Sequence, residues 1–320
     1  MTLINNSIQK AVALLNQDQI IGIPTETVYG LAGNIYSIPA IESIFKMKQR
    51  PFFNPLIVHI KSVEDLPEIV SVIPEKAFML AAAFWPGPLT LVLKKQASIP
   101  DLVTGGKDTV AVRVPNHSLT LALLEQLDYP LAAPSANPFG CISPTAAEHV
   151  ANYFKNLLPM VLDGGVCQRG IESTIIGFDN DEPVLYRMGS LAIEDIELIV
   201  GPVKMRTHDD NTPMAPGMLS RHYAPLTTTH MSANVTELLK TFVNQKIGVL
   251  IFQKGIDNHP NIVAQEILSP TGNLAEAASQ LYAALHRLDE CKLDVIIAER
   301  FPDVGLGKTI NDRLERATKK

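Results

Sequence analysis

Residues 22–33 read Gly-Ile-Pro-Thr-Glu-Thr-Val-Tyr-Gly-Leu-Ala-Gly and follow two isoleucines that are typical of a buried strand. Pro24 lacks a backbone donor and should end that strand. Two threonines flank a glutamate next, and Gly30 and Gly33 allow tight backbone geometry just beyond them. Because α/β sheets usually bind ligands where strands end, this stretch indicates either a ligand site or an ordinary turn.

Length, charge and cysteine content limit the class of protein. The chain has 320 residues, 46% of them hydrophobic, which suffices for one large domain or two ordinary ones. A net charge of −6 argues against wrapping nucleic acid by bulk charge, although a local basic cleft stays open. The three cysteines are widely spaced, which fits a reducing compartment. With no signal-peptide pattern and no run of about 18 apolar residues, we expect a soluble cytoplasmic protein without a membrane span.

The order of apolar patterns predicts two α/β domains joined by a linker. Residues 1–203 mix strands with helices, which favours a domain with a mixed sheet. Residues 204–229 are rich in proline and predict a linker. Its Arg221-His-Tyr223 run favours a segment docked on a neighbouring surface. Residues 230–320 resume the alternation and predict a smaller, parallel, Rossmann-like sheet.

Basic side chains gather where a helix predicted over residues 39–48 should end. Lys48 and Arg50 are followed by Asn54. A planar guanidinium and a point-like ammonium suit a polyphosphate, whereas charges that complement the helix C-terminus would be a solvated face. We favour an anion site here.

Residues 109–113 read Thr-Val-Ala-Val-Arg, so Thr109 and Arg113 share one face of a strand and the valines form the core face. A buried arginine needs either a carboxylate or a ligand phosphate, and both stay open. His59 is either a core histidine or a substrate contact. Ser135 is outside a Gly-x-Ser-x-Gly elbow, so it suits ligand binding and not nucleophilic catalysis. Ser143 either caps a helix or contacts a ligand.

Two familiar motifs fail. Gly305-Leu-Gly-Lys-Thr309 approaches a phosphate loop, but Pro302 stands where that loop needs glycine, so we predict the start of a helix. The histidines lack metal-binding spacing, and zinc is not expected. The remaining strand ends suit an anionic nucleotide together with a small polar partner.

Several segments, taken together and in order, resemble the threonylcarbamoyl-AMP synthase family, which carries the YrdC-like domain. They are residues 22–31, 46–51, 54–59, 84–90, 112–115, 133–137 and 172–174. Residues 216–225 and 305–316 are similar to the long, two-domain form of the family. The resemblance implies a YrdC-like domain with a mixed, twisted sheet, followed by a smaller Rossmann-like α/β domain.

The resemblance implies that L-threonine, bicarbonate or CO2, and ATP are joined into threonylcarbamoyl-AMP with release of pyrophosphate. A separate transferase complex would then modify an adenosine beside the tRNA anticodon. Matched by motif, the L-threonine contacts would be Thr27, His59, Arg113, Ala133 and Ser173. The ATP contacts would be Lys48, Arg50, Asn54, Thr109, Ser135, Ser143, Arg187 and Tyr223. Mg²⁺ would accompany ATP, and catalysis would rest on positioning and charge neutralisation, without a covalent nucleophile.

Two other functions compete with this one. A double-stranded RNA or tRNA-binding module would use a basic concave face, which the acidic balance disfavours, and we expect no stable nucleic-acid binding. A carbamoyl-transfer domain of the hydrogenase-maturation type should carry zinc-finger cysteines and an acylphosphatase segment, which this sequence lacks. We further hypothesise that the linker closes over the site and places Tyr223 near the nucleotide.

Overall fold

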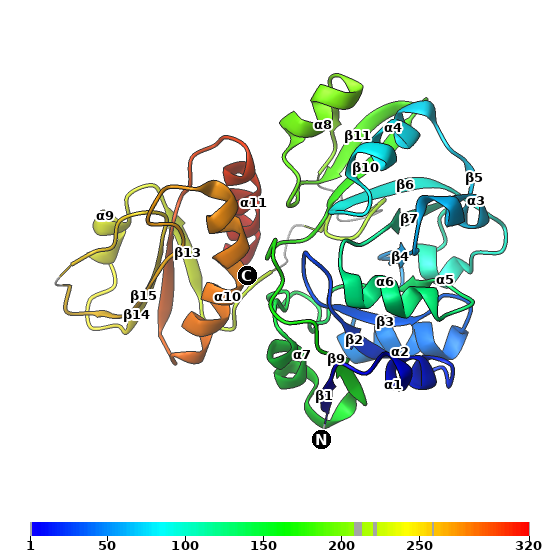
Figure 1. Ribbon diagram of the computed structural model, residues 1–320. Helices are drawn as coiled ribbons and strands as arrows, with labels where there is room; N and C mark the ends of the chain where they lie inside the picture. Colours follow the sequence, from blue (N-terminus) through cyan, green and yellow to red (C-terminus); the bar gives the residue numbers. More distant parts are fainter. Residues whose placement is uncertain (1, 208–212, 220–222, 258, 320) are drawn as a thin grey trace.

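The computed structural model describes residues 2–207, 213–219, 223–257 and 259–319. They form a twelve-stranded mixed sheet and a separate four-stranded sheet, which confirms the predicted α/β fold with a large mixed sheet and a smaller parallel one. Figure 1 shows the two parts side by side. Within the described residues, no helix is both long enough and apolar enough to cross a bilayer.

The elements that build the larger part follow in chain order. They are β1 (Leu3–Asn5), α1 (Ile8–Leu15), β2 (Ile21–Ile23), β3 (Gly30–Asn34), α2 (Ile38–Lys48), β4 (Ile57–His59), η1 (Val63–Asp65), α3 (Leu66–Ile69), β5 (Val70–Val72), α4 (Glu75–Phe84), β6 (Leu89–Lys95), α5 (Asp101–Thr104), β7 (Thr109–Arg113), α6 (Ser118–Glu125), β8 (Leu131–Ala132), α7 (Ala147–Phe154), η2 (Lys155–Leu157), β9 (Met160–Leu162), β10 (Thr174–Asp179), β11 (Glu182–Arg187), α8 (Ile193–Val200) and β12 (Lys204–Met205).

The smaller part has fewer elements. They are β13 (Thr229–Ser232), α9 (Val235–Leu239), β14 (Ile247–Ile251), β15 (Ile262–Ile267), α10 (Leu274–Glu290), β16 (Val295–Glu299) and α11 (Leu306–Thr318). The predicted helix start at residues 305–309 is confirmed, since α11 begins directly after Gly305.

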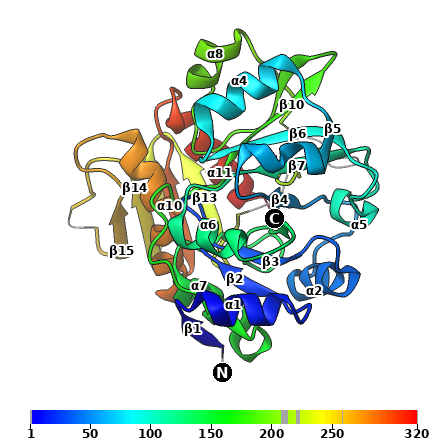
Figure 2. The same cartoon turned by 45° about the vertical axis from the view of Figure 1, so that its right-hand side comes forward.

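The large sheet brings strand ends from distant parts of the chain to a common edge. Its order is β1-β9-β2-β3-β8-β4-β7-β6-β10-β11-β12, and β5 pairs with β6. The strands β4 and β7 are parallel neighbours, so His59 lies opposite Arg113 in register. Val110 and Val112 are buried in the main core, as the alternation predicts. In Figure 2, α4 and α8 lie together at one end of this part, and α1 and α2 at the other.

The small sheet has the order β13-β16-β14-β15, and all its pairs are parallel. Figure 1 shows α10 and α11 on the side that faces the larger part, and α9 on the opposite side. The bounds 1–203, 204–229 and 230–320 stay an interpretation. The strand β12 lies within the predicted linker and pairs with β11, and β13 begins at Thr229.

A stacked pair of histidines joins the two parts. His149 on α7 and His286 on α10 have ring centroids 4.0 Å apart at an interplanar angle of 27°. Nε2 of His286 donates to the carbonyl oxygen of Ser143 at 3.2 Å, and the backbone N–H of Thr145 donates to Nδ1 of His149 at 3.3 Å. Burial, and then the neighbouring His149, lowers the pKa of His286 to about 4. Burial also lowers the pKa of His149.

This pair predicts a loss of stability in mild acid. The pKa of His286 is about 4 in the folded chain and about 6.5 when unfolded, so between these values only the unfolded chain takes up the proton. The free energy of unfolding should therefore fall as the pH decreases from 7 to 5, with His286 contributing about 2 kcal/mol of that fall.

Urea unfolding at both pH values tests this contribution. The His286→Asn variant should show a smaller difference in unfolding free energy between pH 7 and pH 5 than the parent chain. Equal pH dependence in His286→Asn and the parent would contradict the assignment.

Candidate functional site

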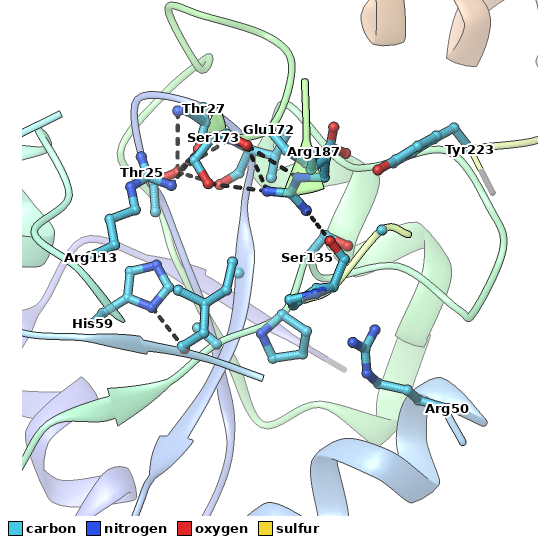
Figure 3. A pocket seen from close by; sticks show the side chains of 17 residues that line it. Thr25, Thr27, Arg50, His59, Arg113, Ser135, Glu172, Ser173, Arg187 and Tyr223 are labelled. Atoms are coloured by element: carbon cyan, nitrogen blue, oxygen red, sulfur yellow. Dashed lines mark hydrogen bonds between the residues drawn. The ribbon is translucent and has the colours of Figure 1, made fainter. Parts of the chain in front are cut away.

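A cavity opens where the strands of the large sheet end. Figure 3 shows the side chains around it. The predicted site residues that line it are Thr27, Arg50, His59, Arg113, Ala133, Ser135, Ser173, Arg187 and Tyr223. The cavity is therefore shared by residues assigned to both ligands.

The loop between β2 and β3 forms one wall through a network of threonine hydrogen bonds. Thr25 Oγ1 donates to the carbonyl oxygen of Val28 at 2.6 Å and accepts from the N–H groups of Thr27 and Val28, both at 3.2 Å. The hydroxyls of Thr25 and Thr27 are 2.8 Å apart. A side-chain oxygen that bonds to backbone two and three residues on fixes a tight loop. The stretch is thus both a turn and a cavity wall.

Arg113, at the end of β7, joins this loop to the sheet. Its Nη1 donates to Thr27 Oγ1 at 3.0 Å and its Nη2 to Glu26 Oε1 at 2.5 Å. Its Nε donates to the carbonyl oxygen of Gly87 at 3.1 Å, and the second oxygen of Glu26 accepts from Asn116 N. The sequence left open whether Arg113 pairs with a carboxylate or with a ligand phosphate, and the structure shows that it pairs with the carboxylate of Glu26. Because Glu26 balances its charge, Arg113 contributes a fixed set of donors without strong net charge.

His59 lies beside Arg113 as a neutral ring. Its Nδ1 donates to the carbonyl oxygen of Ile57 at 3.3 Å. Burial, and then the charge of Arg113, lowers the pKa of His59 to about 3. The ring is therefore uncharged at neutral pH, and this end of the cavity carries hydrogen-bonding groups close to electrical balance.

The opposite end of the cavity carries positive charge. Arg50 lies just after α2, and its Nε and Nη2 donate to Asn54 O at 3.1 Å, Asn54 Oδ1 at 2.7 Å and Pro55 O at 2.7 Å. Arg187, at the end of β11, donates to Ser173 O and Oγ and to the carbonyl oxygen of Pro216. Every one of these acceptors is uncharged.

Within the described residues, neither Arg50 nor Arg187 forms an ion pair with a carboxylate. Burial, and then the charge of Arg187, lowers the pKa of Arg50 to about 9. Burial also lowers the pKa of Arg187. Two buried cations that repel each other leave this end short of negative charge, which an anionic ligand would supply.

The local turn after α2 explains why Arg50 and Lys48 point to different places. Gln49 ends the helix in the left-handed conformation, with φ at 54°. Lys48 is buried behind the cavity wall, where its Nζ donates to Ser135 O at 2.5 Å and to Asn137 O. Lys48 thus holds the backbone that carries Ser135, and its contact with ATP stays a prediction.

Three further predicted ATP contacts also lie outside the cavity lining. Asn54 accepts from Arg50, and its Nδ2 has no hydrogen-bond partner in the part of the chain that is described. Thr109 Oγ1 is likewise buried without a described partner. Ser143 does not cap α7, which begins at Ala147, because its Oγ donates to Glu172 Oε1 at 2.5 Å. Their contacts with a nucleotide stay predictions.

The sequence pattern missed several lining residues, namely Thr25, Val28, Gly30, Ile57, Pro134, Glu172, Pro216 and Gly217. Glu172 is the main omission, because it is the only carboxylate among the described residues that line the cavity. It stands directly before Ser173 in a quoted motif, which was the available signal. Glu26, which pairs with Arg113, lies 87 residues away in the chain and gave no local signal.

Comparison with known proteins covers both parts of the chain. A family model described as "Telomere recombination", for Sua5, YciO and YrdC, matches residues 13–189. A model described as "Threonylcarbamoyl-AMP synthase, C-terminal domain" matches residues 191–318. A threonylcarbamoyl-AMP synthase of Pyrococcus abyssi is 41% identical over 97% of this chain and 94% of the relative. One of Bacillus subtilis is 39% identical over 97% and 92%.

Solved structures agree with this relationship. The structure of Pyrococcus abyssi Sua5 complexed with L-threonine superimposes with a TM-score of 0.91 at 38% identity, and covers 99% of this chain and 97% of that one. These full-length similarities support the synthase over the RNA-binding module. The chain belongs to the threonylcarbamoyl-AMP synthase family, in its two-domain form, and the activity of that family is the synthesis of threonylcarbamoyl-AMP.

Proposed function

We propose that this cavity binds L-threonine and ATP together, and that the chain joins them with bicarbonate or CO2 to form threonylcarbamoyl-AMP and pyrophosphate. The observation that carries the proposal is that Arg50 and Arg187, buried without an ion pair in the part of the chain that the structure describes, share one cavity with the balanced wall of Thr27, His59 and Arg113. The threonine complex of the Pyrococcus abyssi relative supports the amino-acid half of the proposal.

In this proposal, L-threonine lies at the balanced end. Arg113, fixed by Glu26, and the hydroxyl of Thr27 offer donors and acceptors for a zwitterion, and Ala133 and Ser173 complete the assigned contacts. The amine must lose its proton before it attacks CO2. A neutral His59 fits that requirement because it can hydrogen-bond an uncharged amine.

ATP lies at the positive end. The carbamate oxygen must approach the α-phosphate, which brings negative charge next to negative charge. Arg50 and Arg187 reduce that repulsion, and no covalent enzyme nucleophile is required. Ser135 and Tyr223 line the same space. Lys48, Asn54, Thr109 and Ser143 belong to the proposed ATP site as residues behind its wall.

Mg²⁺ enters the proposal as part of the substrate, MgATP. In the described ranges of the chain, no group of three or more His, Cys, Asp or Glu side chains could hold a metal ion, so phosphate and water oxygens would supply most of its ligands. We also infer a cytoplasmic location, which the three widely spaced cysteines fit, and transfer of the product to a separate complex that modifies tRNA.

The linker supplies part of the cavity wall, which supports its proposed role as a lid. Pro216, Gly217 and Tyr223 line the cavity, and Arg187 donates to the carbonyl oxygen of Pro216 at 3.3 Å. N-carboxy-threonine is labile in water, so a closed wall would protect it.

The positive end predicts a specific loss of activity. Arg187→Ala should lower kcat/KM for ATP by about 100-fold, because it removes charge that opposes the repulsion between carbamate and phosphate. Arg113→Ala should instead raise the KM for L-threonine.

For both variants, the measurement is pyrophosphate release from ATP with and without L-threonine and bicarbonate. Arg300→Ala, whose partner Glu315 is on the surface, is the control. Pyrophosphate release that does not depend on threonine would contradict the proposed reaction.

The linker wall predicts that Gly217 tolerates no side chain. A Cβ there would lie 2.7 Å from Arg187 Cδ and 2.8 Å from the Tyr223 hydroxyl, at a φ of +83°. Gly217→Ala should therefore raise the KM for ATP roughly tenfold, equivalent to about 1.4 kcal/mol. Gly106→Ala imposes a similar φ of +79° with nothing within 4 Å, and should leave the KM unchanged. Equal effects of the two variants would reduce the result to backbone strain.

A further inference from the structure

The last helix of the chain buries charge where it meets the larger part. On α11, Asp312, Arg313 and Arg316 are 7%, 1% and 1% exposed. Burying ions removes them from water at considerable cost, and apolar residues at such a place often stabilise a protein more. This polar face therefore asks for an explanation other than stability.

Arg313 touches two walls of the cavity from behind. Its Nε donates to Glu172 Oε2 at 3.1 Å, its Nη1 to Asp312 Oδ2 at 2.5 Å and its Nη2 to Met188 O at 2.6 Å. Its guanidinium carbon lies 4.4 Å from the centroid of the Tyr223 ring. Glu172 and Tyr223 both line the cavity. One side chain of the smaller part thus fixes a carboxylate and an aromatic ring of the site.

Arg316 holds the backbone of the predicted linker. Its Nη1 donates to Gly217 O at 2.9 Å and to Leu219 O at 2.5 Å, and its Nη2 donates to Thr207 O at 3.2 Å. Its Nε donates to Asp312 Oδ1 at 3.0 Å. A single guanidinium therefore joins two described segments of the linker, one of which forms the cavity wall at Gly217.

The charges of this cluster balance one another. Glu172 and Asp312 are both paired with the arginines of α11. Glu172 also accepts from Ser143 Oγ at 2.5 Å and from the Tyr282 hydroxyl at 3.0 Å. Both oxygens of Glu172 are thus occupied by Arg313, Ser143 and Tyr282. Glu172 already acts electrostatically on Arg187 as well as on Arg313. Without Arg313, more of its charge would offset that of Arg187, which the nucleotide needs.

We propose that Arg313 and Arg316 are positioning residues of the active site. Arg316 holds the linker wall in place, and Arg313 limits how far Glu172 neutralises Arg187. The smaller part then contributes to the ATP site through α11. This inference rests on the proposed function of the cavity, because it assumes that Arg187 faces nucleotide phosphate.

Removal of the Arg313 charge tests the part of the proposal that concerns Arg313. Arg313→Gln should raise the KM for ATP about tenfold or more, because the released Glu172 pairs with Arg187. The double variant Glu172→Gln with Arg313→Gln should recover most of that loss, since no carboxylate remains to pair. A merely structural role predicts the opposite, with the double variant no better than the single one. That result would overturn the proposal for Arg313.

Arg316→Lys tests the linker half. Lysine keeps the charge but cannot reach three carbonyl oxygens with one planar fork, so the KM for ATP should rise several-fold while the KM for L-threonine changes less. Arg300→Lys, at a partly exposed residue that pairs with Glu315 of α11, is the control. Thermal unfolding verifies that each variant is folded. A folded Arg316→Lys with the parent's KM for ATP would overturn this half.

The parent chain separates these outcomes from a failure of the proposed function. Threonine-dependent pyrophosphate release by the parent supports that function, and its absence would reject the function itself. With an active parent, only the variants decide whether α11 positions the site. Equilibrium dialysis with ATP provides a readout that does not depend on turnover, and Arg313→Gln should reduce ATP binding in it.

Discussion

Buried positive charge that forms no ion pair among the described residues is the constraint on which the site depends. Arg50 and Arg187 are buried, yet their described partners are carbonyl, amide and hydroxyl oxygens. Neutral acceptors satisfy the hydrogen-bond donors of these arginines but do not compensate their positive charge. An isolated buried charge is costly, and any carboxylate within reach would pair with it. The surrounding structure must therefore hold such a carboxylate in another contact. Glu172 is the carboxylate within the cavity, and it is held by Arg313, Tyr282 and Ser143.

The two ends of the cavity differ in electrostatics although both contain arginine. Arg113 is ion-paired with Glu26 and supplies fixed hydrogen-bond donors, whereas Arg187 forms no ion pair with the described residues and supplies positive potential. A zwitterionic amino acid needs fixed hydrogen-bonding groups more than net charge. A triphosphate needs net charge. In the proposed assignment of ligands, the neutral ring of His59 lies beside an amine that must be uncharged to react.

Local patterns predicted much of this arrangement, and distant pairings explain what they missed. The alternation in residues 109–113 placed Arg113 at a strand end, and the motif around Arg50 placed a cation after α2. No local pattern could show that Lys48, two residues before Arg50, turns away to bind Ser135 and Asn137, because the left-handed Gln49 decides it. Nor could it show that Glu172 meets Arg313, 141 residues further along the chain.

The same distance explains why the role of the smaller part was hidden. Its sequence predicts a Rossmann-like fold, and such folds usually bind ligands at their own strand ends. Here the polar surface that matters is the side of α11 that faces the other part. An apolar face would have joined the two parts with less desolvation. Charged side chains can do what apolar ones cannot: they orient a carboxylate and hold carbonyl oxygens in the cavity wall. The burial of Arg313 and Arg316 is therefore better explained by the geometry of the site than by the stability of the fold.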